Sequence, residues 1–356
     1  MIVDFLSPTD SRWRRFTDRA PHDVYHLAEY ACVASKHEGG EAVAFYVEET
    51  DHALLMPLLV RGLPAELCAP ASWCDAISPY GYPGPIATKG FPSEILADAL
   101  LSFRTLARER DIVSAFVRFN PFRSIPTSLF DGLGVIVNHG PVVYIDLAKS
   151  VDEWWAETRT AHRQDIARLI RSAYTVDMDD WDAYPAFREL YRITMQRLAA
   201  SPFYYFSDEY FDDLRRLLGD RLHLCTVRSP AGDVAAGGLF MLDDGIVAYH
   251  LSGTAESHRA KAPTKLMIDF ARRWAKEQGA SLLNLGGGFG GSGSSLHHFK
   301  TGFSRSQTDF QTARIVFDHD RYDCLTAAWR ELHPTTDDAS NVFFPSYRQP
   351  YTADDA

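Results

Sequence analysis

The first half of the chain contains four apolar runs of strand length and one amphipathic segment. The runs are residues 41–49, 52–62, 113–122 and 140–150. Each predicts a β-strand, and the Thr50-Asp51 turn between the first two predicts a hairpin or meander. Residues 91–112 instead repeat apolar side chains every three or four positions, which predicts a helix that begins near Pro92 and Ser93. Its apolar face carries Ile95, Leu96, Ala99, Leu100, Phe103 and Leu106.

A second helical pattern begins at residue 150 and marks a predicted domain boundary. Ser150 is followed by Glu153 three positions later, which is the pattern of a capping box, so we predict a helix over 150–174. A chain of 356 residues suits two domains of roughly 150 residues each. We therefore expect the domains to be residues 1–149 and 150–356.

The second half continues with an order of elements that is typical of a mixed sheet. Helices are predicted at about 184–199, 208–218 and 261–278, and strands at 222–228, 234–243, 245–253, 281–286 and 309–318. Three successive strands, then a helix, then a further strand indicate an α/β unit. The expected fold class is α/β, with mixed, mostly antiparallel sheets flanked by helices.

Composition and charge narrow the class of protein. Apolar residues make up 46% of the chain and charged residues 23%, as in an ordinary globular protein. No apolar run approaches the roughly 18 residues of a membrane-spanning helix, and the first residues lack the pattern of a signal peptide, so we expect a cytoplasmic protein. The net charge of −11 excludes a general nucleic-acid coat but leaves open a local basic face. The five cysteines show no CxxC spacing, so reduced, mostly buried thiols are expected.

The segment after the strand at 281–286 is almost entirely glycine and serine. Gly286, Gly288 and Gly291 match G-x-G-x-x-G, but a dinucleotide site needs this motif at the first βα turn of a βαβ unit, and only about 65 residues follow. A P-loop is disfavoured because Ser294 stands where the motif requires lysine. A surface loop and a crowded ligand site at the end of a sheet strand both stay open.

The segment beyond these glycines carries the candidate catalytic groups. A short helix is predicted to start near Ser294 or Ser295, and its last turn brings in Phe299 and Lys300. Lysine is a long, mobile point charge that suits a phosphate or a developing oxyanion. Adjacent His297 and His298 point about 100° apart on a helix, so we expect no metal site there.

Several stretches together resemble the Fem family. They are residues 75–87 ("DAISPYGYPGPIA"), 190–214 with its Thr-Met-x-Arg core, 247–281, and 283–304 ("LNLGGGFGGSGSSLHHFKTGFS"). The resemblance implies two tandem GNAT-like domains and an aminoacyl-tRNA-dependent transferase that forms an amide bond. The long helical hairpin that some Fem proteins carry is absent here, which argues against the cell-wall substrates of those proteins.

The resemblance also implies sites for the donor. Gly286, Gly287 and Gly288 would approach it, with Arg259, Lys261 and Lys265 contributing a basic helix start. An acetyl-CoA-dependent GNAT holds pyrophosphate on the amides of Q/R-x-x-G-x-G/A. Here both glycines are missing and Pro263 has no N–H, so the expected donor is aminoacyl-tRNA rather than coenzyme A. Solvated charges on a helix end remain the alternative reading of the three cations.

The acceptor residues implied by the resemblance come from both domains. They are Lys36, Asp75, Tyr80, Tyr82, Arg197, Tyr204, Tyr205 and Tyr249. The loop that holds Tyr80 and Tyr82 is also an ordinary turn sequence, and Arg197 would equally suit a surface salt bridge. Tyr249 and His250 must point to opposite faces of one strand, and for His250 a buried, hydrogen-bonded ring is favoured over a catalytic base.

An acyl transfer without a bound cofactor is therefore expected. Lys300 would stabilise the oxyanion or the terminal nucleotide's phosphate, and Phe299 would pack against the terminal adenosine or shape a tunnel. Four arginines on the helix after residue 150 would contact the tRNA body: Arg159, Arg163, Arg168 and Arg171. An acyl-CoA-dependent N-acyltransferase and a non-catalytic binding protein of the same fold are the alternatives.

Overall fold

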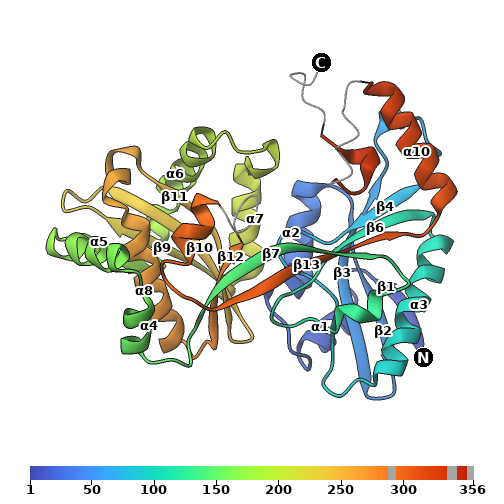
Figure 1. The fold of residues 1–356 in the computed structure, drawn as a ribbon, viewed down its shortest axis with the longest axis horizontal. Helices are drawn as coiled ribbons and strands as arrows, with labels where there is room; N and C mark the ends of the chain where they lie inside the picture. The colour runs from blue at the N-terminus through green and yellow to red at the C-terminus, as the bar shows by residue number, and fades with distance from the viewer. Residues whose placement is uncertain (288–293, 335–342, 351–356) are drawn as a thin grey trace. The chain divides into compact units, whose positions relative to one another are not determined.

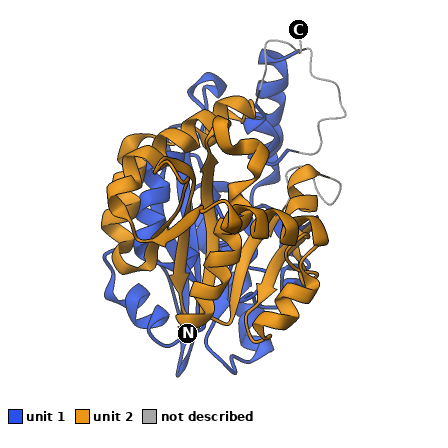
Figure 2. Ribbon diagram, turned by 90° about the vertical axis from the view of Figure 1, so that its left-hand side faces the viewer, with its two compact units in different colours: residues 1–139, 310–356 blue, residues 140–309 orange. Residues whose placement is uncertain are grey.

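The chain forms two compact units (Figure 2). The structure is a computed structural model, and it describes residues 1–287, 294–334 and 343–350. One unit comprises residues 1–139 and 310–356, and the other comprises residues 140–309. The predicted boundary near residue 150 therefore lies about ten residues too late. The assignment of everything after residue 150 to the second domain is corrected as well, because residues 310–356 belong with the first unit.

The first unit is a sheet with both faces covered by helices (Figure 1). Its strands, in sheet order, are β1 (Ile2–Leu6), β2 (Glu41–Glu49), β3 (His52–Gly62), β4 (Cys74–Ile77), β6 (Ile112–Arg118) and β13 (Gln307–Val316), with the short β5 (Ile86–Ala87) beside β3. Neighbouring strands are antiparallel except for β4 and β6. The helices are α1 (Ser11–Thr17), α2 (Ala28–Glu38), α3 (Ser93–Glu109) and α10 (His319–Leu332).

Strand β3 explains why the predicted run at 52–62 is apolar without alternation. Its side chains face two different hydrophobic clusters in turn. Leu54 and Met56 pack into the cluster that includes Phe103 of α3, whereas Ala53 and Leu55 pack into the cluster that includes residues of α1 and α2. A strand that is buried on both faces has no polar face to show.

The return of the chain to the first unit rests on long-range pairing. Strand β13 lies antiparallel to β6, with Ala313 opposite Val117. Helix α10 then buries Leu325 and Trp329 in a small cluster with Val113 of β6. These contacts join residues far apart in sequence, so local periodicity does not reveal them.

The second unit also has helices on both faces of its sheet (Figure 1). Its strands, in sheet order, are β7 (Val135–Asp146, which begins in the first unit), β12 (Leu282–Gly287), β11 (Ile246–Thr254), β10 (Val234–Asp243), β9 (Leu222–Arg228) and β8 (Thr175–Met178). Among the described strand pairs of this unit, β11–β12 is the parallel one, and β7–β12, β10–β11, β9–β10 and β8–β9 are antiparallel. The helices are α4 (Val151–Glu157), α5 (Thr160–Arg171), α6 (Tyr184–Arg197), α7 (Asp208–Leu218), α8 (Pro263–Glu277) and α9 (Ser295–Lys300).

Two adjacent glycines of β10 allow helices to approach from both sides. A Cβ on Gly237 would lie 2.9 Å from the ring of Phe187 on α6, and one on Gly238 would lie 2.8 Å from the terminal methyl of Met267 on α8. Successive strand residues face opposite sides of the sheet, so each glycine makes room for a different helix.

The predicted fold class is confirmed, and most predicted elements are present near their expected bounds. The main local error is the helix predicted over 150–174, which is two helices. The capping box of Ser150 and Glu153 is formed, but Thr158 has an extended backbone (φ −65°, ψ 127°) that ends α4. Helix α5 then starts after Arg159 in a new direction. Among the described residues, no helix is long and apolar enough to cross a membrane.

Candidate functional site

The end of β12 is where the candidate site begins. Strands β11 and β12 pair in parallel from Ile246 to Ala248 and from Leu282 to Asn284. On its other side β12 pairs with β7 from Leu282 to Gly287, with a bulge between Asn284 and Gly286, and Gly286 adopts φ +78°. The Gly286 N–H donates to Asn284 Oδ1 at 2.8 Å. A positive φ is costly for residues with a Cβ, so this bend favours glycine.

Lys300 is buried at the end of this strand. Only 7% of the residue is exposed, and its Nζ donates to the carbonyl oxygen of Gly287 at 2.6 Å. Burial lowers the pKa of Lys300 from 10.5 to about 7, because the ammonium form loses its hydration. The side chain is thus poised between charged and neutral near physiological pH. The sequence analysis singled out Lys300 as a mobile point charge, whereas the structure shows a buried amine.

Phe299, the second predicted catalytic residue, directly precedes Lys300 on α9 and is partly buried. Its ring packs against the core of the second unit, with ring centroids 5.5 Å from His162 and 5.4 Å from Phe303. A role in shaping the site is consistent with this position. Contact with an adenosine stays a prediction.

The three predicted donor-binding cations all have partners inside the second unit. Arg259 donates to Glu256 at 2.9 Å, Lys261 to the Tyr174 hydroxyl at 3.1 Å, and Lys265 to Asp165 at 2.6 Å. The 3₁₀ helix η7 (Glu256–Lys261) and the left-handed Ala262 (φ 56°) lead into α8. Of the predicted glycines, Gly287 accepts the Lys300 hydrogen bond, and Gly288 lies outside the described residues.

The predicted acceptor residues of the second unit separate onto different surfaces. Arg197 pairs with Glu256 at 3.1 Å as a surface ion pair. Tyr204 and Tyr205 instead line a pocket of about 310 Å³ between α6 and the start of α7, and 42% of Tyr205 is exposed. On α6 this pocket is lined by Arg188, Tyr191, Arg192, Met195 and Gln196. At 100° per residue, Arg197 points to the opposite side of that helix. The three residues that the sequence placed together therefore do not share one surface.

Tyr249 and His250 point to opposite faces of β11, as predicted. Tyr249 stacks on Phe240, and its hydroxyl donates to Ser252. His250 Nε2 lies 2.9 Å from the hydroxyl of Tyr210, and burial lowers the pKa of His250 to about 3. The ring is neutral and hydrogen-bonded, as the sequence favoured.

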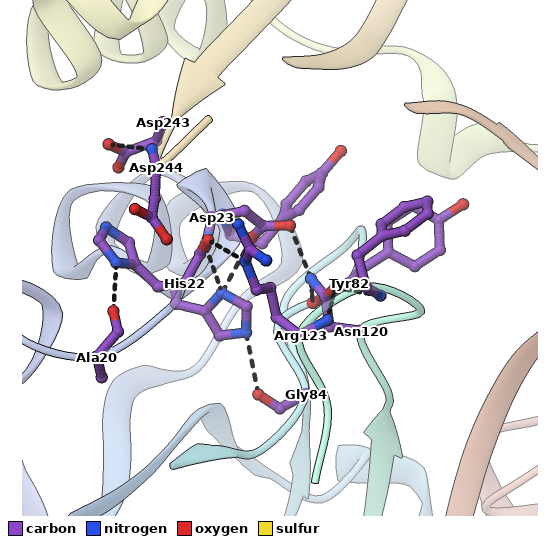
Figure 3. Close-up of polar contacts among 12 residues, drawn as sticks. Ala20, His22, Asp23, Tyr82, Gly84, Asn120, Arg123, Asp243 and Asp244 are labelled. Atoms are coloured by element: carbon purple, nitrogen blue, oxygen red, sulfur yellow. Dashed lines mark hydrogen bonds and ion pairs between the residues drawn. The ribbon is translucent and has the colours of Figure 1, made fainter. Parts of the chain in front are cut away.

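The Tyr/Gly/Pro loop of the first unit is held through its backbone carbonyls (Figure 3). The Tyr30 hydroxyl donates to Tyr80 O at 2.9 Å, Asn120 Nδ2 to Tyr82 O at 2.9 Å, and His26 Nε2 lies 3.2 Å from Gly84 O. Asn120 is itself positioned by Asp23, whose carboxylate accepts from Asn120 Nδ2 at 2.7 Å. The turn sequence predicted a loop. The four side chains that hold it come from residues whose pattern carried no such signal.

Asp75 and Lys36 occupy very different environments in the first unit. Asp75 is fully buried, and its two carboxylate oxygens accept from Arg61 (3.0 Å) and Arg348. This geometry indicates a structural ion-pair network, in which each oxygen of the Asp75 carboxylate already accepts from an arginine. Lys36 is exposed on the last turn of α2.

The arginines predicted to contact tRNA differ in their partners, and one of them belongs to the Lys300 site. Arg159 donates to the carbonyl oxygen of His298 at 2.9 Å, next to Lys300. Arg163 donates to Trp155 O at 3.3 Å, Arg168 pairs with Asp165 at 2.8 Å, and Arg171 is exposed. Among the described residues no group of three His, Cys, Asp or Glu side chains is arranged to hold a metal ion.

Comparison with known proteins shows a GNAT domain in the second unit and relates the fold of the whole chain to solved structures. Residues 156–301, which include most of the second unit and Lys300, match the acetyltransferase (GNAT) domain family. The solved structure titled FemX superimposes with a TM-score of 0.70 at 15% identity, covering 90% of this chain and 99% of FemX. L-PGS from Bacillus licheniformis gives a TM-score of 0.57 at 13% identity, covering 88% of this chain and 94% of that one. No curated protein matches by sequence.

A third structure extends the same relationship. The C-terminal domain of a putative lysylphosphatidylglycerol synthetase from Agrobacterium fabrum gives a TM-score of 0.55 at 14% identity, covering 91% of this chain and 95% of that domain. The chain thus has a tandem GNAT-like α/β fold, it shares its overall fold with the FemX structure, and its second unit carries the GNAT domain. The resemblance to the Fem fold expected from the sequence is confirmed.

Proposed function

We propose that this protein is an acyltransferase that moves an aminoacyl group from aminoacyl-tRNA to a primary amine. The acceptor would be a peptide, a peptidoglycan precursor or a specialised metabolite. The observation that carries the proposal is Lys300, a buried amine held on the Gly287 carbonyl at 2.6 Å inside the GNAT domain. A buried cation is costly unless an opposite charge pairs with it, and an oxyanion would supply that charge.

The proposed reaction requires no covalent intermediate with the protein. The acceptor nitrogen attacks the ester carbonyl carbon, the C–N bond forms, and the C–O bond to the terminal ribose breaks. The proton lost from the amine neutralises the departing ribose oxygen. The ester is already activated, so alignment of the two reactants contributes much of the rate. The Lys300 ammonium would stabilise the negative charge on the carbonyl oxygen as the tetrahedral intermediate forms.

The start of α8 supports tRNA over coenzyme A as the donor. Coenzyme A would need free backbone N–H groups there for its pyrophosphate. Pro263 provides none at the first position of α8, and the Lys265 N–H is bonded to Ala262 O at 3.0 Å. The nearby side chains of Lys261 and Lys265 are also engaged with Tyr174 and Asp165.

The name of one relative with a similar fold fits the transfer of an aminoacyl group. The name of the Agrobacterium protein describes an enzyme that makes an aminoacylated lipid. FemX matches this chain over nearly its whole length. Transfer of an aminoacyl group by this chain is therefore a natural hypothesis, with an acyl-CoA-dependent N-acyltransferase and a non-catalytic binding protein as alternatives.

The test compares the two donors directly. The protein is incubated with tRNAs charged with labelled amino acids and with a panel of primary amines or a cell extract, while labelled acetyl-CoA is used in parallel. We expect amide-linked label from charged tRNA, and no heat of binding when coenzyme A is titrated calorimetrically. Transfer from acetyl-CoA alone would refute the proposal in favour of the first alternative. Ligand binding without any transfer would favour the second.

A further inference from the structure

Helix α9, which carries Lys300, is held at its C-terminal end by the first turn of α5. Arg159 contributes four contacts. Its backbone N–H donates to Gly302 O at 2.8 Å. Its guanidinium donates to His298 O at 2.9 Å, and it lies 2.7 Å from His298 Nε2 and 3.4 Å from Thr301 Oγ1. The last carbonyls of a helix have no partner within the helix, and a cation near them is favourable.

His162 makes the contact nearest to Lys300. Its Nε2 lies 3.0 Å from the carbonyl oxygen of Phe299, the residue directly before Lys300. The ring also packs against Phe303 at a centroid distance of 4.8 Å. Only a glycine fits beside it, because a Cβ on Gly302 would lie 2.3 Å from His162 Nε2.

The protonation state of His162 suits this contact. A carbonyl oxygen can only accept, so Nε2 must carry the proton. The other ring nitrogen, Nδ1, is buried and has no hydrogen-bond partner, which disfavours a second proton. Burial, reinforced by Lys265, lowers the pKa of His162 to about 4. The ring is therefore a neutral, permanent donor at physiological pH.

We propose that Arg159 and His162 are positioning residues that fix α9 so that the Lys300 amine stays buried against the Gly287 carbonyl. This inference gives α5 a role within the site, in place of the tRNA contact that the sequence suggested for Arg159. Its importance for catalysis rests on the proposed function, but the placement of Lys300 can be tested without any enzymatic assay.

The test measures the protonation of Lys300 directly. The chain has only seven lysines, so ¹³Cε-lysine labelling gives few signals, and the Lys300 signal is assigned from its loss in Lys300→Met. The wild-type signal should titrate near pH 7, well below the ordinary value of 10.5. In His162→Ala and in Arg159→Ala, α9 loosens and water reaches the amine, so the midpoint should rise by about one unit or more.

Two matched variants separate positioning from general damage. His162→Gln places an amide N–H near the position of Nε2 and should restore a midpoint close to that of the wild type. Arg163→Ala removes the next arginine of α5, which contacts Trp155 and Thr160 rather than α9, and should leave the Lys300 titration midpoint at its wild-type value. If His162→Ala fails to fold, Arg159→Lys, which keeps the charge but loses the paired contacts, provides the comparison.

The titration results distinguish failure of this inference from failure of the proposed function. Folded Arg159 and His162 variants whose Lys300 signal titrates as in the wild type would overturn the inference. So would a shift of equal size in Arg163→Ala. A shifted midpoint in a protein that transfers no aminoacyl group would instead support the inference and refute the proposed function.

Discussion

The Nζ of Lys300 donates to the carbonyl oxygen of Gly287 at 2.6 Å, and this contact places an amine with a pKa of about 7 at the end of β12. Lysine substitutions therefore give the most direct test of the site. Lys300→Met keeps the apolar stem and removes the amine. We expect transfer to fall by about 10²–10³-fold, the usual effect of losing one oxyanion-stabilising donor.

The stability of Lys300→Met provides its internal control. Only one hydrogen bond is lost, worth about 1 kcal/mol, and the larger cost of burying an ammonium is relieved, so the free energy of unfolding at pH 7 should be at least that of the wild type. Lys89 is exposed in the first unit, and Lys89→Met should retain full transfer. Equal activity of the two variants would remove Lys300 from the mechanism.

The pH dependence of the reaction follows from the same residue. Burial disfavours the ammonium, so Lys300 loses its proton as the pH rises through about 7. If the ammonium stabilises the oxyanion, kcat should be highest below this value and should fall above it. Initial rates at saturating donor and acceptor, measured on both sides of neutrality, check this. The acceptor amine must itself be neutral to attack, so only a rise above neutrality that is lost in Lys300→Met would indicate that neutral Lys300 is the active form.

The pH dependence of stability has a definite sign. The pKa of Lys300 is lower in the folded chain than its ordinary value of 10.5, so between about pH 7 and 10.5 the unfolded chain binds more protons. The contribution of Lys300 to stability therefore rises with pH in that window, by up to about 1.4 kcal/mol per pH unit. Denaturation curves of the wild type and Lys300→Met at several pH values should show this slope disappearing in the variant.

Asp75 is expected to act on stability rather than on acceptor binding. Asp75→Asn leaves Arg61 and Arg348 facing an amide in place of a buried carboxylate. Removing one partner of a buried pair costs about 3–5 kcal/mol, and the lower end is expected because the arginines are 16% and 20% exposed. Urea denaturation measures the loss, with the exposed Asp51→Asn as control. A stable variant with weakened acceptor binding would restore the role that the Fem resemblance implied.

Unlike Asp75, Arg197 is expected to contribute little to stability. Its pair with Glu256 is exposed on both sides, with 29% and 58% of the side chains accessible, so Arg197→Ala should cost less than about 1 kcal/mol. Because folding is preserved, a rise in KM for the acceptor would report a contact with substrate. An unchanged KM would leave Arg197 as a surface ion pair only.

The sequence by itself determined the elements whose signal is local. The bounds of α7, β9 and β10 match the predicted 208–218, 222–228 and 234–243, because their caps and periodicity lie within each segment. The Fem-like stretches likewise pointed to the fold and to Lys300 before any contact was known. The capping box at Ser150 formed as expected.

Only the tertiary structure decided which residues meet. Contacts between segments far apart in the chain decide four features. They are the return of β13 to the first unit, the burial of Lys300, the end of α4 at Thr158, and the hydrogen bonds from Arg159 and His162 to α9. The same applies to Asp75, whose partner Arg348 lies near the other end of the sequence. Burial and pKa are sums over such neighbours, so periodicity and motif spacing carry no record of them.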